Sequence, residues 1–170
     1  MRRAALELGG LDLLVNAAAD GFVSKPIEEV TEEIWDGAFA AAAKGSFFVT
    51  QAAIPHLRSS ELGLVVMVED VASFQPWPLL SAHCAAKAAQ AMLTRVFARS
   101  LAPEIRVCGI APGSVAVPEE LAEKRARQNL LGRVGSPDDV ALAVLFLIDA
   151  DFVTGSTIFV DGGRMIAPPP

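Results

Sequence analysis

The chain has 170 residues, the size of one domain, and this length is enough to bury a sizeable core. Its residues are 52% hydrophobic and its formal net charge is −6, which argues against a nucleic acid as partner. No run approaches the ~20 apolar residues of a membrane helix, and Glu7 interrupts the start where a secretory signal would be apolar, so we expect no membrane partner and a cytoplasmic location.

Short apolar runs alternate with helix-length patterns along the chain. The runs predict strands at about 11–16, 64–69, 105–110 and 157–161. Strands that alternate with helices form βαβ units, in which the strands run parallel. We therefore predict an α/β fold with about four parallel strands flanked by helices. It would form a single domain over residues 1–170, with a frayed Pro-rich tail at 164–170.

The predicted helices carry start and stop signals. Thr31, followed by two glutamates, predicts a capped helix start, and a second helical piece covers 46–57. A long helix begins at Ser81 and is stopped by Pro103. Ser136-Pro137 starts the last helix, whose sequence VALAVLFL is apolar nearly all round. Such a helix has to be covered on more than one side.

The segment GLVVMVEDVASFQPWPLLSAHCAAKAAQA contains the candidate catalytic residues. Two carboxylates, Glu69 and Asp70, stand at the end of the second apolar run. Ligands of open α/β sheets bind outside the carboxyl ends of the strands, so Asp70 falls where chemistry is expected. His83 and Lys87 are four residues apart on the next predicted helix and share one face. An acid, a titratable ring and a cation should therefore meet in one crevice.

This spacing resembles that of a known family. Short-chain dehydrogenases/reductases have a strand that ends in Ser and, thirteen residues later, a helix with the pattern Tyr-x-x-x-Lys; here Asp70, His83 and Lys87 stand at those places. Further motifs follow in the family's order: LDLLVNAAA, IRVCGIAPGSV, GRVGSPDDVALAVLFL and FVTGSTIFVDGG. Asp70, after VVMVE and before Gln75-Pro76, looks more like the pteridine-reductase branch. The resemblance runs almost from end to end and implies the C-terminal part of a Rossmann-like doubly wound parallel sheet.

The resemblance implies catalytic roles for three residues. The family counterpart of Lys87 binds the nicotinamide ribose and lowers the pKa of the catalytic Tyr. His83 stands in the place of that Tyr, where Asp70 favours the charged ring and Lys87 disfavours it. We hypothesise that His83, supported by Asp70, delivers a proton to a substrate oxygen or imine nitrogen as hydride arrives. The alternative is a histidine retained at a disabled site, which Ala42 favours, because the family has there an Asn that holds a proton-relay water.

The resemblance also places residues beside a nicotinamide cofactor. Asn16 matches the first Asn of the family's Asn-Asn-Ala-Gly, where it shapes the strand end near the adenine ribose, and Ala17 is small enough to permit close approach. Four more candidates follow the third predicted strand: Pro112, Gly113, Ser114 and Val115. Their family counterparts lie against the nicotinamide ring. A plain turn from strand to loop is the alternative for this segment.

The family's dinucleotide fingerprint, a Gly-rich turn after the first strand, has no counterpart in the sequence. Relative to the family, the chain begins near the end of the third crossover helix, so the phosphate cradle and the residue that selects NAD or NADP are missing. The choice between NAD and NADP therefore stays open. The strand at 11–16 would form an apolar sheet edge, which promotes aggregation. Either the chain is a fragment of a longer product, which we favour, or another chain covers this edge.

The sequence is compatible with three function classes. The favoured one is an NAD(P)-dependent oxidoreductase that transfers hydride to a C=O or C=N bond of a small molecule, with pteridines among the candidates. The second is a catalytically impaired binding or assembly protein, or an inactive fragment. The third is a hydrolase that uses Asp70, His83 and either Ser81 or Ser73, and it is weakly supported because the sequence has no G-x-S-x-G turn.

The partners follow from the same resemblance. In the family, the helices corresponding to 31–57 and 81–101 pack against a second subunit, which implies a homo-oligomer, either a dimer or a tetramer. Cys84 and Cys108 lack the spacing of a metal site, so no metal is expected.

Overall fold

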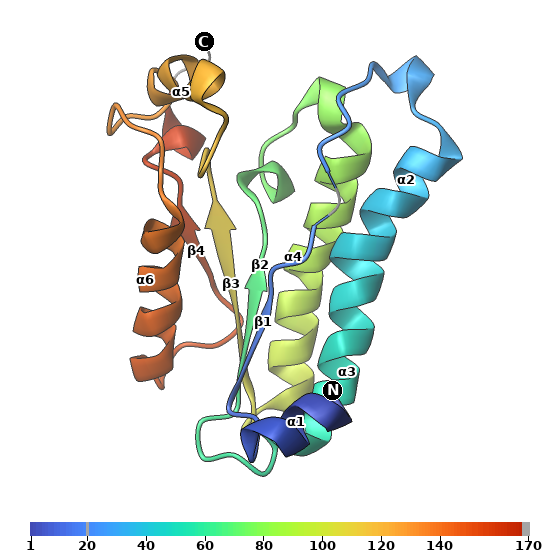
Figure 1. The fold of residues 1–170 in the computed structure, drawn as a ribbon, viewed down its shortest axis with the longest axis vertical. Helices are drawn as coiled ribbons and strands as arrows, with labels where there is room; N and C mark the ends of the chain where they lie inside the picture. The colour runs from blue at the N-terminus through green and yellow to red at the C-terminus, as the bar shows by residue number, and fades with distance from the viewer. Residues whose placement is uncertain (20, 168–170) are drawn as a thin grey trace.

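The structure, a computed structural model that describes residues 1–19 and 21–167, contains a four-stranded parallel sheet (Figure 1). The strands are β1 (Leu13–Asn16), β2 (Leu64–Val68), β3 (Arg106–Pro112) and β4 (Thr157–Val160). They are hydrogen-bonded in the order β1-β2-β3-β4, and every neighbouring pair is parallel. The predicted fold class and the predicted strands are confirmed, with strand ends that differ by two residues at most.

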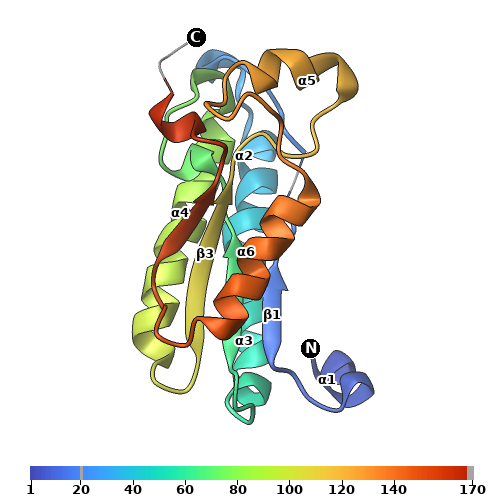
Figure 2. The same cartoon turned by 90° about the vertical axis from the view of Figure 1, so that its left-hand side faces the viewer.

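Helices cover both faces of the sheet (Figure 1), and Figure 2 looks onto one of the covered faces. α3 (Ser46–Leu57) and α4 (Ser81–Leu101) pack on one face, and α6 (Pro137–Asp149) packs on the other. α2 (Glu32–Phe39) contacts α4, α5 (Glu119–Ala126) lies beyond the carboxyl ends of the strands, and α1 (Arg2–Leu8) lies near their amino ends (Figure 1). The shorter helices are η1 (Ile27–Glu29), η3 (Val71–Ser73), η4 (Pro78–Leu80) and η5 (Arg164–Ile166).

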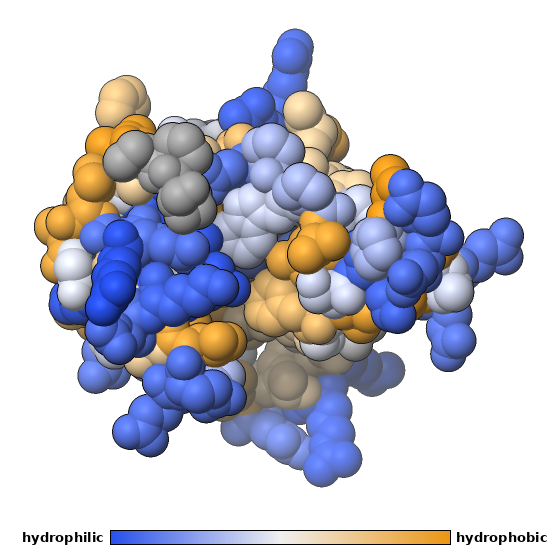
Figure 3. Space-filling view, turned by 90° about the horizontal axis from the view of Figure 1, so that it is seen from above, coloured by the Kyte–Doolittle hydropathy of each residue, from blue (hydrophilic) through white to orange (hydrophobic). Residues whose placement is uncertain are grey.

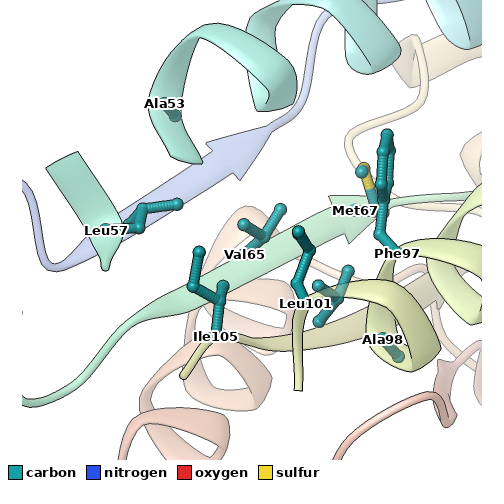
Figure 4. Close-up of a cluster of buried hydrophobic side chains, with 9 residues drawn as sticks. Ala53, Leu57, Val65, Met67, Phe97, Ala98, Leu101 and Ile105 are labelled. Atoms are coloured by element: carbon teal, nitrogen blue, oxygen red, sulfur yellow. The ribbon is translucent and has the colours of Figure 1, made fainter. Parts of the chain in front are cut away.

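Strand β2 lies between two hydrophobic cores. Val65 and Met67 face α3 and α4, where they pack with Leu57, Phe97 and Leu101 (Figure 4). Leu64 and Val66 face the other way, toward Ala143 and Leu147 of α6. Side chains alternate between the two faces of a strand, so a strand that is covered on both sides is apolar at every position. This is the physical reason for the continuous run LVVMV.

The predicted helix starts are confirmed by side-chain caps. Thr31 Oγ1 accepts a hydrogen bond from the Ile34 N–H, and Ser136 forms a capping box with Asp139. Two predicted helical pieces, however, join into one path, because a π-helical segment, η2 (Ala40–Gly45), connects α2 directly to α3.

Helix α6 is covered on one side only by the part of the chain that the structure describes. Ala143 and Leu147 are buried, whereas Leu142, Leu145 and Phe146 are more than half exposed. The second cover that the sequence predicts for this helix is therefore not supplied by residues 1–19 and 21–167.

Within the described residues, no helix has both the length and the apolar character needed to span a bilayer. Of the predicted tail at 164–170, residues 164–166 form η5, and residues 168–170 lie outside the described part.

Candidate active site

Asp70 and His83 meet at the carboxyl end of β2. Asp70 is two residues past β2, and its Oδ1 accepts a hydrogen bond of 2.8 Å from the Ala72 N–H, which caps η3. Its other oxygen, Oδ2, lies 3.1 Å from His83 Nε2 in the first turn of α4. Both side chains are largely buried. The expectation that the acid and the ring share one crevice is confirmed.

This geometry fixes the roles of the two ring nitrogens of His83. An ionised Asp70 carboxylate only accepts hydrogen bonds, so Nε2 carries a hydrogen and, in the neutral ring, Nδ1 is the acceptor. The ring of Phe22 packs at 4.8 Å from the His83 ring. His83 is thus held by an acid at one nitrogen and by an aromatic neighbour.

Lys87 lies one helical turn beyond His83 and is buried. Its Nζ donates a 2.8 Å hydrogen bond to the Val68 carbonyl oxygen at the end of β2 and a 2.9 Å hydrogen bond to Gln90 Oε1. Burial lowers the pKa of Lys87, while the negative charges of Asp70 and Glu69 oppose that effect. The site therefore contains a desolvated ammonium that is held from two sides.

A cavity of about 20 Å³ lies beside these residues. His83 and Lys87 form one wall, and small side chains, among them Ala38, Ala42 and Ala82, form much of the rest. Ala42 lies in the π-helical segment and lines this space without filling it. The face of the molecule over the carboxyl ends of the strands, seen from above in Figure 3, mixes hydrophilic and hydrophobic residues.

Glu69 is a site residue whose contacts sequence reasoning missed. It is 2% exposed, and its carboxylate accepts hydrogen bonds from Thr94 Oγ1 at 2.6 Å and from Thr157 Oγ1 at 2.9 Å. Burial raises the pKa of Glu69, and the two threonine hydrogen bonds oppose that effect. The available signal was the helical spacing of Lys87, Gln90 and Thr94, which puts three polar side chains on one buried face of α4.

The predicted cofactor residues at β1 lie elsewhere in the packing. Asn16 is buried, and its Nδ2 donates to Thr50 Oγ1 at 3.0 Å and to Met67 Sδ at 3.3 Å. Its side chain therefore joins β1 to α3 and β2. Ala17, the next residue, is exposed.

The predicted residues after β3 face β4 and the segment before α6. Pro112 pairs with Val160, and the Gly113 N–H donates to the Val160 carbonyl oxygen at 3.0 Å. A Cβ atom on Gly113 would lie 2.8 Å from the Asp161 Cα atom, so packing within the chain already requires glycine there. Val115 forms a β-bridge with Gly135. Ser114 lines a larger cavity of about 380 Å³, whose walls include none of the three predicted catalytic residues.

The described residues contain no group of three or more His, Cys, Asp or Glu side chains that could hold a metal ion.

Comparisons with known proteins identify the family. The family model described as enoyl-(acyl carrier protein) reductase matches residues 1–164. Human dehydrogenase/reductase SDR family member 4 is 36% identical over 167 residues, which cover 91% of this chain and 60% of that protein. The chain belongs to the short-chain dehydrogenase/reductase family. The chain spans 60% of the length of this human relative, which is less than two thirds.

Two further relatives of this family are similar in sequence or fold. The 3-oxoacyl-(acyl-carrier-protein) reductase of Thermotoga maritima is 35% identical over 170 residues, 93% of this chain and 68% of that protein. The ligand-free structure of Thermoplasma acidophilum aldohexose dehydrogenase superposes with a TM-score of 0.93 at 26% identity, covering 99% of this chain and 73% of the other. The Rossmann-like fold that the resemblance implied is confirmed.

Membership of the short-chain dehydrogenase/reductase family implies a nicotinamide cofactor, NAD or NADP. The residues of this chain fit one end of such a group. Two of the three ammonium hydrogens of Lys87 have acceptors among the described residues, which leaves one for a ligand hydroxyl. At the other end, the family's Gly-rich turn has no counterpart in the sequence of residues 1–170. The fit therefore concerns the nicotinamide-ribose end only.

Proposed function

We propose that this chain is the larger part of a nicotinamide-dependent oxidoreductase that transfers hydride to a C=O or C=N bond of a small molecule. The single observation that carries the proposal is the 3.1 Å contact between Asp70 Oδ2 and His83 Nε2, because His83 lies one helical turn before Lys87 on α4. In this proposal residues 1–170 are one incomplete Rossmann-like domain. A pteridine-like substrate is the more specific form, supported by Asp70 after VVMVE and by Gln75-Pro76.

His83 acts as the proton donor in this proposal. When bound, the nicotinamide supplies the hydride to the substrate carbon. The imidazolium form of His83 gives its Nδ1 hydrogen to the substrate oxygen or imine nitrogen. The ring then becomes neutral, and its Nε2–H group stays hydrogen-bonded to Asp70. Asp70 fixes the tautomer and stabilises the charged ring, as a carboxylate does in other acid–histidine pairs.

The residues that the sequence analysis placed beside the cofactor are proposed to bind it. Lys87 donates its remaining hydrogen to a ribose hydroxyl. Asn16 and Ala17 shape the end of β1, and the segment 112–115 borders the ring, with NAD and NADP both open. Asn16 would act through the backbone it fixes, because its own amide is bound to Thr50 and Met67.

A homo-oligomer is proposed through α3 and α4. Phe48 and Val49 on α3 and Met92 and Val96 on α4 are large hydrophobic side chains that are at least 40% exposed. Exposed apolar patches on helices are typical of subunit interfaces. The cytoplasmic location remains a prediction from the sequence.

A non-catalytic binding or assembly protein is the second candidate. Ala42 favours it, because an alanine offers no hydrogen bond to the cavity beside Lys87. The same apolar faces of α3 and α4 would serve this function without any reaction.

Fluorescence titration with NADPH and NADH tests the proposal on this chain and on a form extended at its N-terminus by the upstream coding sequence. We expect binding by the extended form and reductase turnover that falls about 10²- to 10⁴-fold in His83→Phe. His56→Phe, at the other histidine of the chain, is the matched control and should retain turnover. Cofactor binding without turnover would favour the second candidate. Full turnover in His83→Phe would mean that another group donates the proton.

A further inference from the structure

Gln90 is a fully buried polar side chain in the middle of α4. Its Nε2 donates a 2.8 Å hydrogen bond to Ser46 Oγ in the first turn of α3, and its Oε1 accepts the 2.9 Å hydrogen bond from Lys87 Nζ. These two partners fix the orientation of the amide, because the reversed amide would point an N–H group at the ammonium. Gln90 therefore presents an acceptor, and only an acceptor, to Lys87.

On the cavity side of Lys87, position 42 supplies no side-chain acceptor. Ala42 lines the cavity of about 20 Å³ beside the ammonium and has only a methyl group. A buried ammonium without hydrogen-bond acceptors would lose much of its charge stabilisation. The hydrogen-bond acceptors of Lys87 are instead Gln90, three residues further along α4, and the Val68 carbonyl at the end of β2.

We propose that Gln90, held by Ser46, is a positioning residue of the active site: it keeps Lys87 charged and points the remaining ammonium hydrogen toward the cavity. This inference rests on the proposed function of Lys87 as a ligand of the cofactor ribose. Gln90 itself touches neither substrate nor cofactor in this arrangement. It compensates from within the core for the polar side chain that position 42 lacks.

Two carboxylates among the described residues act on Lys87. Asp70 and Glu69, both at the end of β2, act on it electrostatically, and His83 lies one turn before it on the same helix. Arg95 in turn acts on Glu69. None of these groups changes when Gln90 is replaced, so a change in the titration of Lys87 would report on the lost hydrogen bond.

The direct test is a pH titration of Lys87 by NMR in this chain labelled with ¹³C at the lysine Cε atoms, with the Lys87 signal assigned by its absence in Lys87→Met. Gln90→Met, which has similar length and no amide, should lower the Lys87 pKa by about 1. Gln90→Glu restores the acceptor and should return that pKa to the wild-type value or above. Thr50→Val, which breaks the buried hydrogen bond to Asn16, is the matched control and should leave the Lys87 titration unchanged.

The same variants separate a positioning role from a structural one in the N-terminally extended form. Gln90→Met should raise KM for the cofactor about 10-fold, with a smaller change in kcat, and move the alkaline limit of activity to lower pH. An unchanged Lys87 pKa in folded Gln90→Met would overturn the inference. Because the NMR titration needs no turnover, it still decides on Gln90 if the proposed reductase activity fails.

Discussion

Glu69 on the end of β2 and Gly109 in the middle of β3 are packed so closely that only a hydrogen atom fits between them. A Cβ atom on Gly109 would lie 2.1 Å from Glu69 Oε1. The buried carboxylate therefore occupies the space that a side chain at position 109 would need. From there it accepts hydrogen bonds from Thr94 on α4 and Thr157 on β4. This contact explains why β3 has a glycine at position 109, beside the buried carboxylate of Glu69.

Gly109→Ala should destabilise the fold by about 1–3 kcal/mol, because the added methyl group must displace either the Glu69 carboxylate or the backbone. Urea unfolding monitored by circular dichroism measures the free energy of unfolding. Gly21→Ala is the control, because a Cβ atom added there would meet none of the described atoms within 4 Å, and it should change stability by less than about 0.5 kcal/mol. Equal stability of the two variants would contradict the close packing.

Glu69→Gln should change how stability depends on pH. Burial raises the pKa of Glu69 in the folded state above its ordinary value of 4.5, so the folded chain binds this proton more tightly than the unfolded chain does. The stability that protonated Glu69 contributes is complete below pH 4.5 and is lost as the pH rises through the folded pKa. Urea titrations between pH 4 and 8 should show this fall in the wild type and not in Glu69→Gln, whereas the exposed control Glu61→Gln should keep it. Parallel pH profiles for all three proteins would show that Glu69 does not titrate differently in the folded state.

Asp70→Asn should separate catalysis from stability. Asn caps a helix about as well as Asp, so the cap on η3 should survive with a stability change within about 0.5 kcal/mol. The uncharged amide, however, neither stabilises an imidazolium nor enforces the hydrogen on His83 Nε2. Reductase turnover of the N-terminally extended form should therefore fall about 10²- to 10⁴-fold, and Asp151→Asn on the exposed surface should be neutral. Retained turnover in Asp70→Asn would remove the acid–histidine pair from the mechanism.

Ser136→Ala should loosen the start of α6. The variant loses the Ser136 side of the capping box with Asp139, which costs about 0.5–2 kcal/mol. Amide hydrogen exchange should rise in the first turn of α6, at residues 138–140, more than in α4. Ser100→Ala, an exposed serine in the last turn of α4, offers a control without a cap. Unchanged exchange in α6 would mean that its start is held by packing rather than by the cap.

The sequence by itself determined the strands, the caps and the family. Apolar runs such as LVVMV, the cap residues Thr31 and Ser136, and the spacing from Asp70 to His83 are all local patterns. Local patterns can be recognised in a sequence because each depends on the period of one strand or helix, or on its ends. The meeting of Asp70 and His83 could be predicted for the same reason: a strand end and the start of the next helix lie at one edge of a parallel sheet.

Only the tertiary structure decided which polar side chains are already satisfied inside the protein. Asn16 turned out to bind Thr50, Gly113 to pack against Asp161, and Gln90 to join Lys87 to Ser46. Three of these contacts join residues that are far apart in the chain, and each depends on how closely the packed elements approach one another. No periodicity encodes such distances, because they arise when two cores pack on opposite faces of one sheet and leave the buried polar groups to find partners.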